Sequence, residues 1–137
     1  MLKASLRNKP YLTYEADIFY HLGLAYCRLE KFEKSIFPFT RCIEKMPSDL
    51  RYIHERAKAY QMIERHEQAV EDFDIVVRKS PKNANAYFRR AFSLKALKRY
   101  NLAIDDFEKA KQLDPMNEKL MVNYKKLKGV HCIVLCQ

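Results

Sequence analysis

The amino-acid sequence predicts an all-α fold made of three similar helix–turn–helix units. Three prolines, Pro47, Pro81 and Pro115, recur 34 residues apart, and residues of matching size recur at the same interval between them. Only two glycines, Gly23 and Gly129, occur in the 137 residues. Repetition at this interval indicates stacked units that share a continuous core, whereas scarce glycine argues against an all-β fold rich in tight turns.

Small and apolar residues at fixed positions define the repeat. In the third unit they are Tyr87, Ala91, Leu94, Ala103, Phe107 and Ala110; in the second Ile53, Ala57, Tyr60, Ala69, Phe73 and Val76; in the first Phe19, Gly23, Tyr26, Ser35, Phe39 and Cys42. This pattern resembles the tetratricopeptide repeat family over residues 16–117. We expect Phe39, Phe73 and Phe107 to lie in the core.

The resemblance implies a right-handed α-solenoid of three tetratricopeptide-like repeats with a C-terminal capping helix. The expected parts are an N-terminal extension or remnant of a preceding repeat (1–14), three repeats (16–49, 50–83 and 84–117), the capping helix (118–129) and an apolar tail (130–137). A solenoid needs such a cap because its last repeat otherwise exposes an apolar face.

In the first repeat we expect helices over 15–29 and 33–46. Pro10 should break any helix that precedes it, because proline lacks the backbone donor that a helix needs. Pro38 should kink the second helix for the same reason. Gly23 costs roughly 1 kcal/mol within a helix, so its expected role is to let a partner helix approach closely.

Helices are also expected over 50–63, 67–79, 84–97, 101–113 and 118–128. Their N-termini follow residues that cap helices well, namely Ser48 or Asp49, Asn83 and Asn117. The tail that follows is too short to span a bilayer. We expect it to fold back onto the solenoid or to remain exposed.

The composition points to a soluble protein with a basic surface. The net charge is +9, with 48% hydrophobic and 31% charged residues. Because no long apolar run and no signal peptide occur, we expect a cytoplasmic protein, with nuclear and ciliary locations left open. The four cysteines, Cys27, Cys42, Cys132 and Cys136, are then expected as reduced thiols. The oligomeric state is left open.

No arrangement of residues typical of an enzyme occurs, and we expect no catalysis and no cofactor. Paired aspartates, Asp72 with Asp74 and Asp105 with Asp106, are expected on the solvated side of second helices. No phosphate-binding glycine loop is present.

Two groups of residues have side chains that can bind a metal ion, but neither group predicts a metal site. His21 and His54 occupy nearby faces of consecutive first helices, with Glu55 as a further ligand. His131, Cys132 and Cys136 would supply three ligands on the tail.

The resemblance implies that the first helix of each repeat lines a concave groove that takes an extended peptide or a partner helix. The expected groove residues are Tyr20, His21, Leu24, Arg28, Arg51, His54, Lys58, Asn85, Phe88, Arg89, Phe92 and Lys95. Aromatic anchors beside basic residues are typical of binding hot spots. The hypothesis is a non-enzymatic interaction module that binds a peptide or helix with acidic and hydrophobic residues.

Two other functions remain as alternatives. Chaperone adaptors of this family hold C-terminal carboxylates with Lys, Asn and Arg, but the matching positions here are Tyr20, Leu24, Glu55, Asn85 and Arg89, of which only Arg89 agrees. Single-stranded nucleic acid could stack on Tyr87, Phe88, Tyr100 and Tyr124 beside the basic C-terminal part, although no RNA-binding signature is present.

Overall fold

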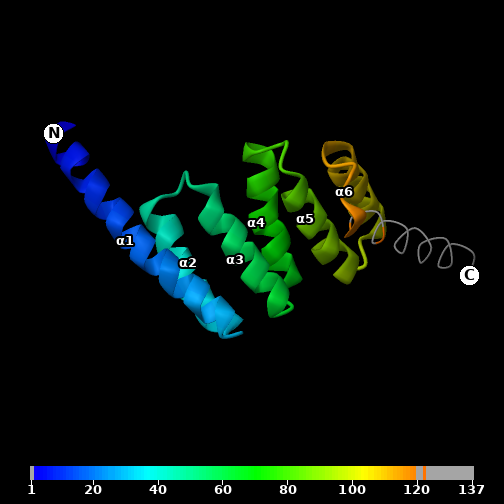
Figure 1. Ribbon diagram of the computed structural model, residues 1–137, viewed down its shortest axis with the longest axis horizontal. Coiled ribbons are helices and arrows are strands. Elements are labelled where there is room, and N and C mark those ends of the chain that lie inside the picture. The colour runs from blue at the N-terminus through cyan, green and yellow to red at the C-terminus, as the bar shows by residue number, and fades with distance from the viewer. Residues whose placement is uncertain (1, 120–121, 123–137) are drawn as a thin grey trace, which may run out of the picture. The chain divides into compact units, whose positions relative to one another are not determined.

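In this computed structural model the backbone is described for residues 2–119 and 122, and the side chains from Pro10 onward. Over these residues the chain forms helices and no strand, which confirms the all-α fold class. The helices are α1 (Leu2–Arg28), α2 (Phe32–Lys45), α3 (Leu50–Met62), α4 (His66–Lys79), α5 (Ala84–Ala96) and α6 (Tyr100–Leu113) (Figure 1).

Five of these helices confirm the expected boundaries to within one residue at each end, and α1 corrects the sixth. The sequence predicted a helix over 15–29, yet α1 begins at Leu2 and runs through Pro10. The expectation that Pro10 breaks the helix is therefore wrong. Proline removes one backbone donor but keeps a helical φ, so a single missing hydrogen bond does not end a helix that continues to Arg28.

Helix α2 likewise continues through Pro38, whose side chain is buried. The predicted kink at Pro38 stays a prediction. The predicted helix over 118–128 and the tail lie mostly outside the described residues, which end with Lys119 and Val122. None of the described helices is long and apolar enough to cross a membrane.

Two predicted N-caps are confirmed. The Asp49 side chain accepts a hydrogen bond from the backbone N–H of Arg51 at the start of α3. Asn83 does the same for Ala86 at the start of α5, with 3.1 Å between Oδ1 and N. Each cap satisfies a backbone donor that the first turn of a helix leaves without a partner.

The turn inside each repeat follows one hydrogen-bonding pattern that the sequence did not predict. Glu30, Glu64 and Lys98, each 34 residues from the next, have left-handed φ angles of 58°, 60° and 61°. The residue after each donates to a carbonyl five positions earlier, as in the 2.8 Å bond from Arg99 N to Leu94 O. These are Schellman caps, where glycine is the usual residue, so the absence of glycine concealed them.

The chain divides into two compact units, Met1–Arg65 and His66–Gln137. The first contains α1, α2 and α3, and the second contains α4, α5 and α6. The division falls inside the second predicted repeat.

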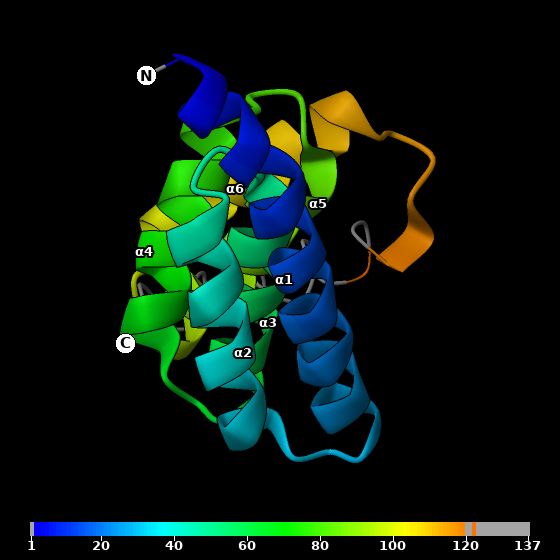
Figure 2. The same cartoon turned by 90° about the vertical axis from the view of Figure 1, so that its left-hand side faces the viewer.

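In the first unit α1 and α2 pack as an antiparallel pair (Figure 2), and Phe39 fills the space beside Gly23. Phe39 is fully buried, and a Cβ built on Gly23 would lie 2.5 Å from its ring. The expectation that Gly23 permits close helix approach is thereby confirmed. Next to this contact, Ala16 and Cys42 pack with Tyr52 of α3.

The buried Cys42 thiol belongs to the same packing. Its Sγ donates to the carbonyl oxygen of Ala16 at 3.2 Å, and burial raises the pKa of the thiol to about 11. A group that is protonated, hydrogen-bonded and enclosed contributes to packing and has little nucleophilic character.

The core of the second unit is centred on Phe107, which is buried together with Val70, Ala91, Leu94, Ala103 and Ala110. The predicted core positions Phe39, Phe73 and Phe107 are all buried, which confirms the assignment. Alanine at 91 occupies the position that Gly23 holds in the first repeat, so a small residue recurs beside the core phenylalanine.

Two of the four aspartates expected on the solvated side of the second helices correct that expectation, because Asp72 and Asp106 are buried, whereas Asp105 is exposed. Arg90 of α5 explains Asp106: its guanidinium makes two 2.7 Å bonds to this carboxylate and one of 2.9 Å to Asp74. Burial raises the pKa of Asp106, and the bonds from Arg90 oppose that shift. Pattern reasoning missed this pair because the two partners lie 16 residues apart on different helices.

We predict that Gly23→Ala destabilises the protein by about 1–3 kcal/mol, because the added methyl group overlaps the Phe39 ring. At a helical site without this contact, the same change should stabilise by roughly 1 kcal/mol. Urea denaturation measures the difference. The matched background is Phe39→Leu, in which the cost of Gly23→Ala should shrink. A stabilised Gly23→Ala variant would show that the contact is absent.

We predict that Arg90→Met lowers the free energy of unfolding by about 3–5 kcal/mol at neutral pH, since it leaves the buried Asp106 carboxylate uncompensated. Burial then raises the folded-state pKa of Asp106 further, so the folded protein binds a proton more readily than the unfolded chain. The deficit should therefore shrink as the pH falls into the acid range.

Denaturation at neutral and mildly acid pH measures this deficit, and Arg90→Met with Asp106→Asn should recover part of it. Arg41→Met is the matched control, because the Arg41–Glu44 pair is exposed and should contribute less than about 1 kcal/mol. A loss for Arg90→Met as small as that of the control would contradict the prediction.

Candidate peptide-binding surface

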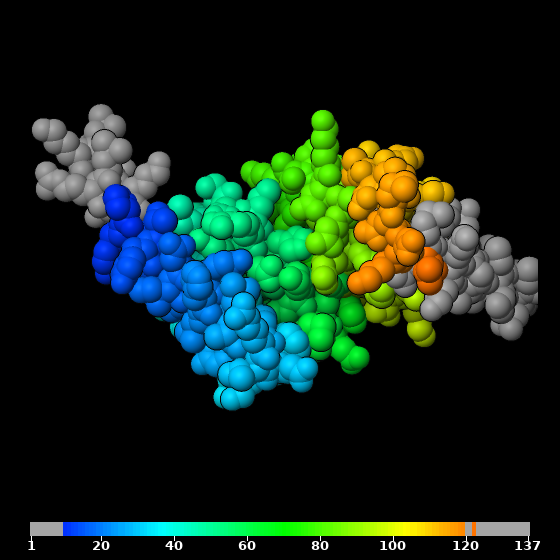
Figure 3. Space-filling view, viewed as in Figure 1, coloured from blue at the N-terminus to red at the C-terminus, as the bar shows by residue number. Residues whose placement is uncertain are grey.

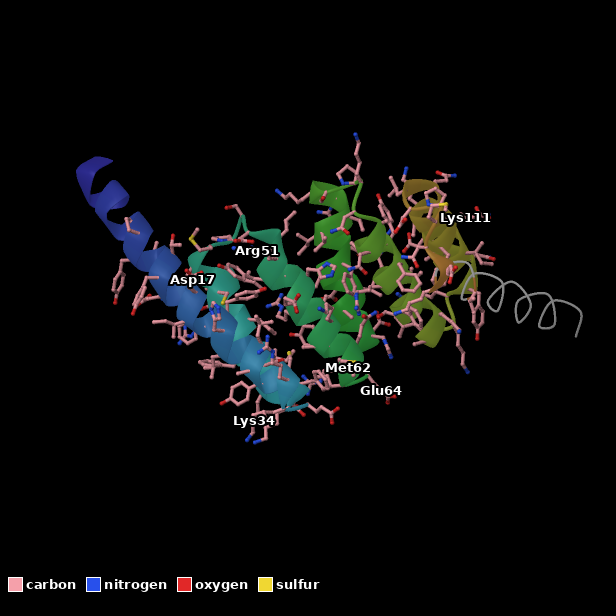
Figure 4. All side chains as sticks on the ribbon, in the orientation of Figure 1. Asp17, Lys34, Arg51, Met62, Glu64 and Lys111 are labelled. Carbon is pink, nitrogen blue, oxygen red and sulfur yellow. The ribbon has the colours of Figure 1, made fainter. Side chains whose placement is uncertain are left out.

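The predicted site residues lie on one side of each first helix. On α1 and α3 of the first unit, and on α5 of the second, most of them are three or four residues apart, and Tyr20–His21 and Phe88–Arg89 are adjacent, so each set follows one side of its helix. Within the first unit the faces of α1 and α3 adjoin, and Asp17 and Arg51 mark their equivalent positions (Figure 4).

Tyr20 lies where α1 and α3 of the first unit meet. Its ring lies 5.5 Å from that of Tyr52 and 6.3 Å from that of Phe39. The Arg51 guanidinium lies over both tyrosine rings, at 5.8 Å from Tyr20 and 5.6 Å from Tyr52. Burial raises the pKa of the Tyr20 hydroxyl, and the nearby Glu55 carboxylate adds to the shift. The ring is therefore a half-buried, neutral platform.

Much of the basic charge expected on this face already has an acidic partner. Arg51 bonds the N-cap Asp49 through Nε at 3.0 Å and Nη2 at 2.7 Å, and this contact lowers the pKa of the Asp49 carboxyl. Lys58 Nζ lies 3.2 Å from both carboxylate oxygens of Glu55. Both pairs are partly exposed, so a ligand carboxylate would compete with Asp49 and Glu55 for these cations.

His21, Leu24 and Arg28 line the last turns of α1. Together with Ala25 and Leu29 they border an open hollow of about 340 Å³. The His21 Nδ1 lies 2.8 Å from the backbone oxygen of Asp17, so this ring is held on its own helix. His54 lies half-buried on α3. Among the described residues no group of three or more metal ligands gathers.

In the second unit, Phe88 and Phe92 of α5 form an aromatic cluster with Phe107 of α6. Ring centroids are 5.2 Å apart for Phe88 and Phe92, 5.6 Å for Phe88 and Phe107, and 6.1 Å for Phe92 and Phe107. Phe107 is buried, Phe88 is half-buried and Phe92 is exposed, so the cluster runs from the core to the surface.

Polar and basic residues of α5 flank this cluster. Asn85 is exposed at the start of the helix, while Arg89 and Lys95 are half-buried on the same face. The spacing of Asn85, Arg89, Phe92 and Lys95 keeps them along one side of the helix. An exposed phenylalanine on a rigid aromatic base, with cations along the same helix face, can bind an apolar side chain next to a carboxylate.

The structure thus brings Tyr20 and Arg51 together and places Phe88 beside Phe92. Two contributors were absent from the expected site: Tyr52, which supports Tyr20 and Arg51, and Asp49, which holds Arg51. The N-cap position of Asp49 was readable from the sequence, but its bond to the Arg51 side chain was not.

Comparisons with known proteins agree with this fold. A family model of the tetratricopeptide repeat matches residues 84–117. Comparison with curated protein sequences finds no significant match.

Several solved structures resemble most of the chain. The tetratricopeptide domain of Arabidopsis OM64 is 26% identical with a TM-score of 0.82, covering 86% of this chain and 98% of that domain. The second such domain of human RPAP3, solved with the HSP70 peptide SGPTIEEVD, is 26% identical with a TM-score of 0.80, covering 85% and 98%. The first such domain of Spaghetti (RPAP3), bound to the HSP90 peptide SRMEEVD, is 23% identical with a TM-score of 0.83, covering 87% and 94%.

The helix–turn–helix repeats place this chain among the all-α repeat proteins. Residues 84–117 match the tetratricopeptide repeat model, and the described helices share the fold of solved tetratricopeptide domains.

Proposed function

We propose that this protein is a non-enzymatic interaction module whose first-helix faces bind a peptide or partner helix with acidic and hydrophobic residues. The observation that carries the proposal is the surface of α5, where Phe92 is exposed on the Phe88–Phe107 base along the same face as Arg89 and Lys95. Two similar tetratricopeptide domains were solved with peptides that end in acidic residues, which supports a peptide as the ligand class.

The mechanism is display on a rigid frame. Phe88 and Phe92 pack against the buried Phe107, so their rings are already ordered before a ligand arrives. Ordered side chains lose little freedom on binding, and more of the contact energy then appears as affinity. Apolar ligand residues would contact Phe92, and a ligand carboxylate would bond Lys95 or Arg89.

The proposal predicts that Phe92→Ala and Lys95→Glu each weaken binding at least tenfold, because they remove the apolar anchor and reverse a flanking charge. The probe is a fluorescein-labelled peptide in which Asp and Glu alternate with Leu and Phe, titrated by fluorescence anisotropy. Lys109→Glu is the matched control, since Lys109 is exposed on α6. It should leave the affinity unchanged once equal thermal stability is verified.

Two further probes make the outcome decisive. The same peptide with Lys in place of the acidic residues should bind at least tenfold more weakly. A labelled single-stranded RNA should bind more weakly than the acidic peptide at physiological salt. Tighter RNA binding would favour the nucleic-acid alternative, and equal loss of affinity in Lys109→Glu would show that the α5 face is not the site.

The chaperone-adaptor alternative makes a different prediction. At the positions that hold a carboxylate in adaptors of this family, the first unit presents Tyr20, packed on Tyr52, and Glu55, bonded to Lys58. A C-terminal carboxylate there would face an acidic side chain and a half-buried ring.

We therefore predict that the peptide SRMEEVD binds at least tenfold more weakly than the alternating peptide. Isothermal titration calorimetry provides the measurement. Glu55→Asn, which removes the repelling charge, should strengthen whatever SRMEEVD binding exists. Micromolar binding of SRMEEVD to the unaltered protein would instead favour the adaptor function.

A further inference from the structure

Five large apolar side chains form a line along the exposed side of α1, called here the α1 stripe. Their spacing of three, four and seven residues keeps them on one side of the helix. They are Tyr11, Tyr14, Ile18, Leu22 and Leu29, with exposed fractions of 61%, 66%, 53%, 40% and 64%. Ala25, also exposed, completes the line between Leu22 and Leu29. Single exposed apolar residues are ordinary, but a continuous line of them indicates an interaction surface.

The same face is covered in the other two repeats. Ile18 corresponds to Tyr52 and Ala25 to Ala59, which are 2% and 1% exposed, and the third-repeat counterparts Ala86 and Ser93 are fully buried. Tyr52 packs against Cys42 of α2, the second helix of the preceding repeat.

The residues that correspond to Leu22 in the other two repeats also contact the preceding second helix. They are Arg56 and Arg90, which bond Thr40 at 3.3 Å and Asp74 at 2.9 Å. No described helix precedes α1, and one side of this helix, in blue, faces the viewer in Figure 3. The α1 stripe therefore resembles the helix-packing faces of the other two repeats, and no described helix covers it.

We propose that the α1 stripe pairs with the α1 stripe of a second copy, with the two helices antiparallel. An antiparallel pair centred between Ile18 and Leu22 would place these two residues opposite each other. Tyr11 and Tyr14 of one copy would then lie opposite Leu29 and Ala25 of the other. Those two residues border the 340 Å³ hollow, so the bulky end of one stripe meets the recessed end of its partner.

Charge does not oppose this contact. Each member of the stripe is uncharged. Glu15, the carboxylate next to Tyr14, forms an ion pair with Lys45 of α2 and also hydrogen-bonds Tyr11. Burial of the stripe would thus remove no charge of its own members from water, while Arg28, which borders the hollow, would lie near the partner's tyrosine rings.

A head-to-tail contact with α6 of another copy fits less well. The faces of α2 and α4 that cover the next repeat include Thr40 and Asp74, and the corresponding residue of α6 is Glu108. Arginine at 56 and 90 matches a polar residue there, whereas Leu22 would place an apolar side chain against a carboxylate. Burial of a carboxylate without a cation is costly, so the antiparallel pair is favoured.

Sedimentation equilibrium of the full chain from low to high micromolar concentration tests the proposal. The expected result is a dimer of the 16.4 kDa chain with a micromolar dissociation constant, since one helix pair is a small interface. Leu22→Arg, which introduces the residue type of positions 56 and 90, should weaken dimerisation at least tenfold. Tyr14→Arg, at the most exposed member of the stripe, should do the same.

Leu102→Arg is the matched control, because Leu102 is an exposed leucine of α6 at 54% and lies outside the stripe. It should dimerise like the unaltered chain, and equal melting temperatures exclude unfolding as the cause in all variants. A monomer at every concentration would overturn the proposal. So would dimers that persist in both stripe variants, or species that grow beyond a dimer, which would indicate head-to-tail assembly.

Discussion

In the first and third repeats, the contact between the phenylalanine of the second helix and a small residue of the first helix is the constraint on which the structure depends. In the first repeat the Phe39 ring occupies the space where Gly23 has no side chain, and in the third Phe107 and Ala91 share one core. A larger residue at the small position would force the two helices apart, because cores are packed as densely as crystals. Since 34-residue spacing repeats this contact, it also sets which face of each first helix remains available for a ligand.

Ion pairs and cation–π contacts orient the side chains that remain accessible on the first helices. Asp49 holds Arg51 over Tyr20 and Tyr52, and Glu55 pairs with Lys58, so the first unit presents an aromatic platform whose cations are partly engaged. The α5 face differs, because Phe92 is exposed above an aromatic base. The aromatic cluster of α5 therefore carries the proposed function more directly than the basic charge that the composition suggested.

Size patterns that recur along the sequence were sufficient to predict the repeat, five helices and the core positions Phe39, Phe73 and Phe107, and residue type predicted two N-caps. Two expectations failed because each rested on the chemistry of a single residue and left out the contacts around it. Pro10 was expected to break a helix, although a single lost bond is tolerated, and Asp106 was expected in solvent, although Arg90 accompanies it into the core. The Schellman caps at Glu64 and Lys98 went unnoticed because neither residue is glycine. Of the site, the helix faces were predictable but the pairing of their charges was not.

The most direct measurement of the central constraint is the unfolding free energy of Phe107→Ala beside that of Phe92→Ala, by urea denaturation. Both rings belong to the same aromatic cluster, but Phe107 is 1% exposed and Phe92 39%. If the packing of Phe107 holds the repeat together, Phe107→Ala should lose about 3–5 kcal/mol or its cooperative transition, and Phe92→Ala should lose far less. Equal losses, or a Phe107→Ala variant as stable as the unaltered protein, would contradict the repeat register on which the fold and the site are built.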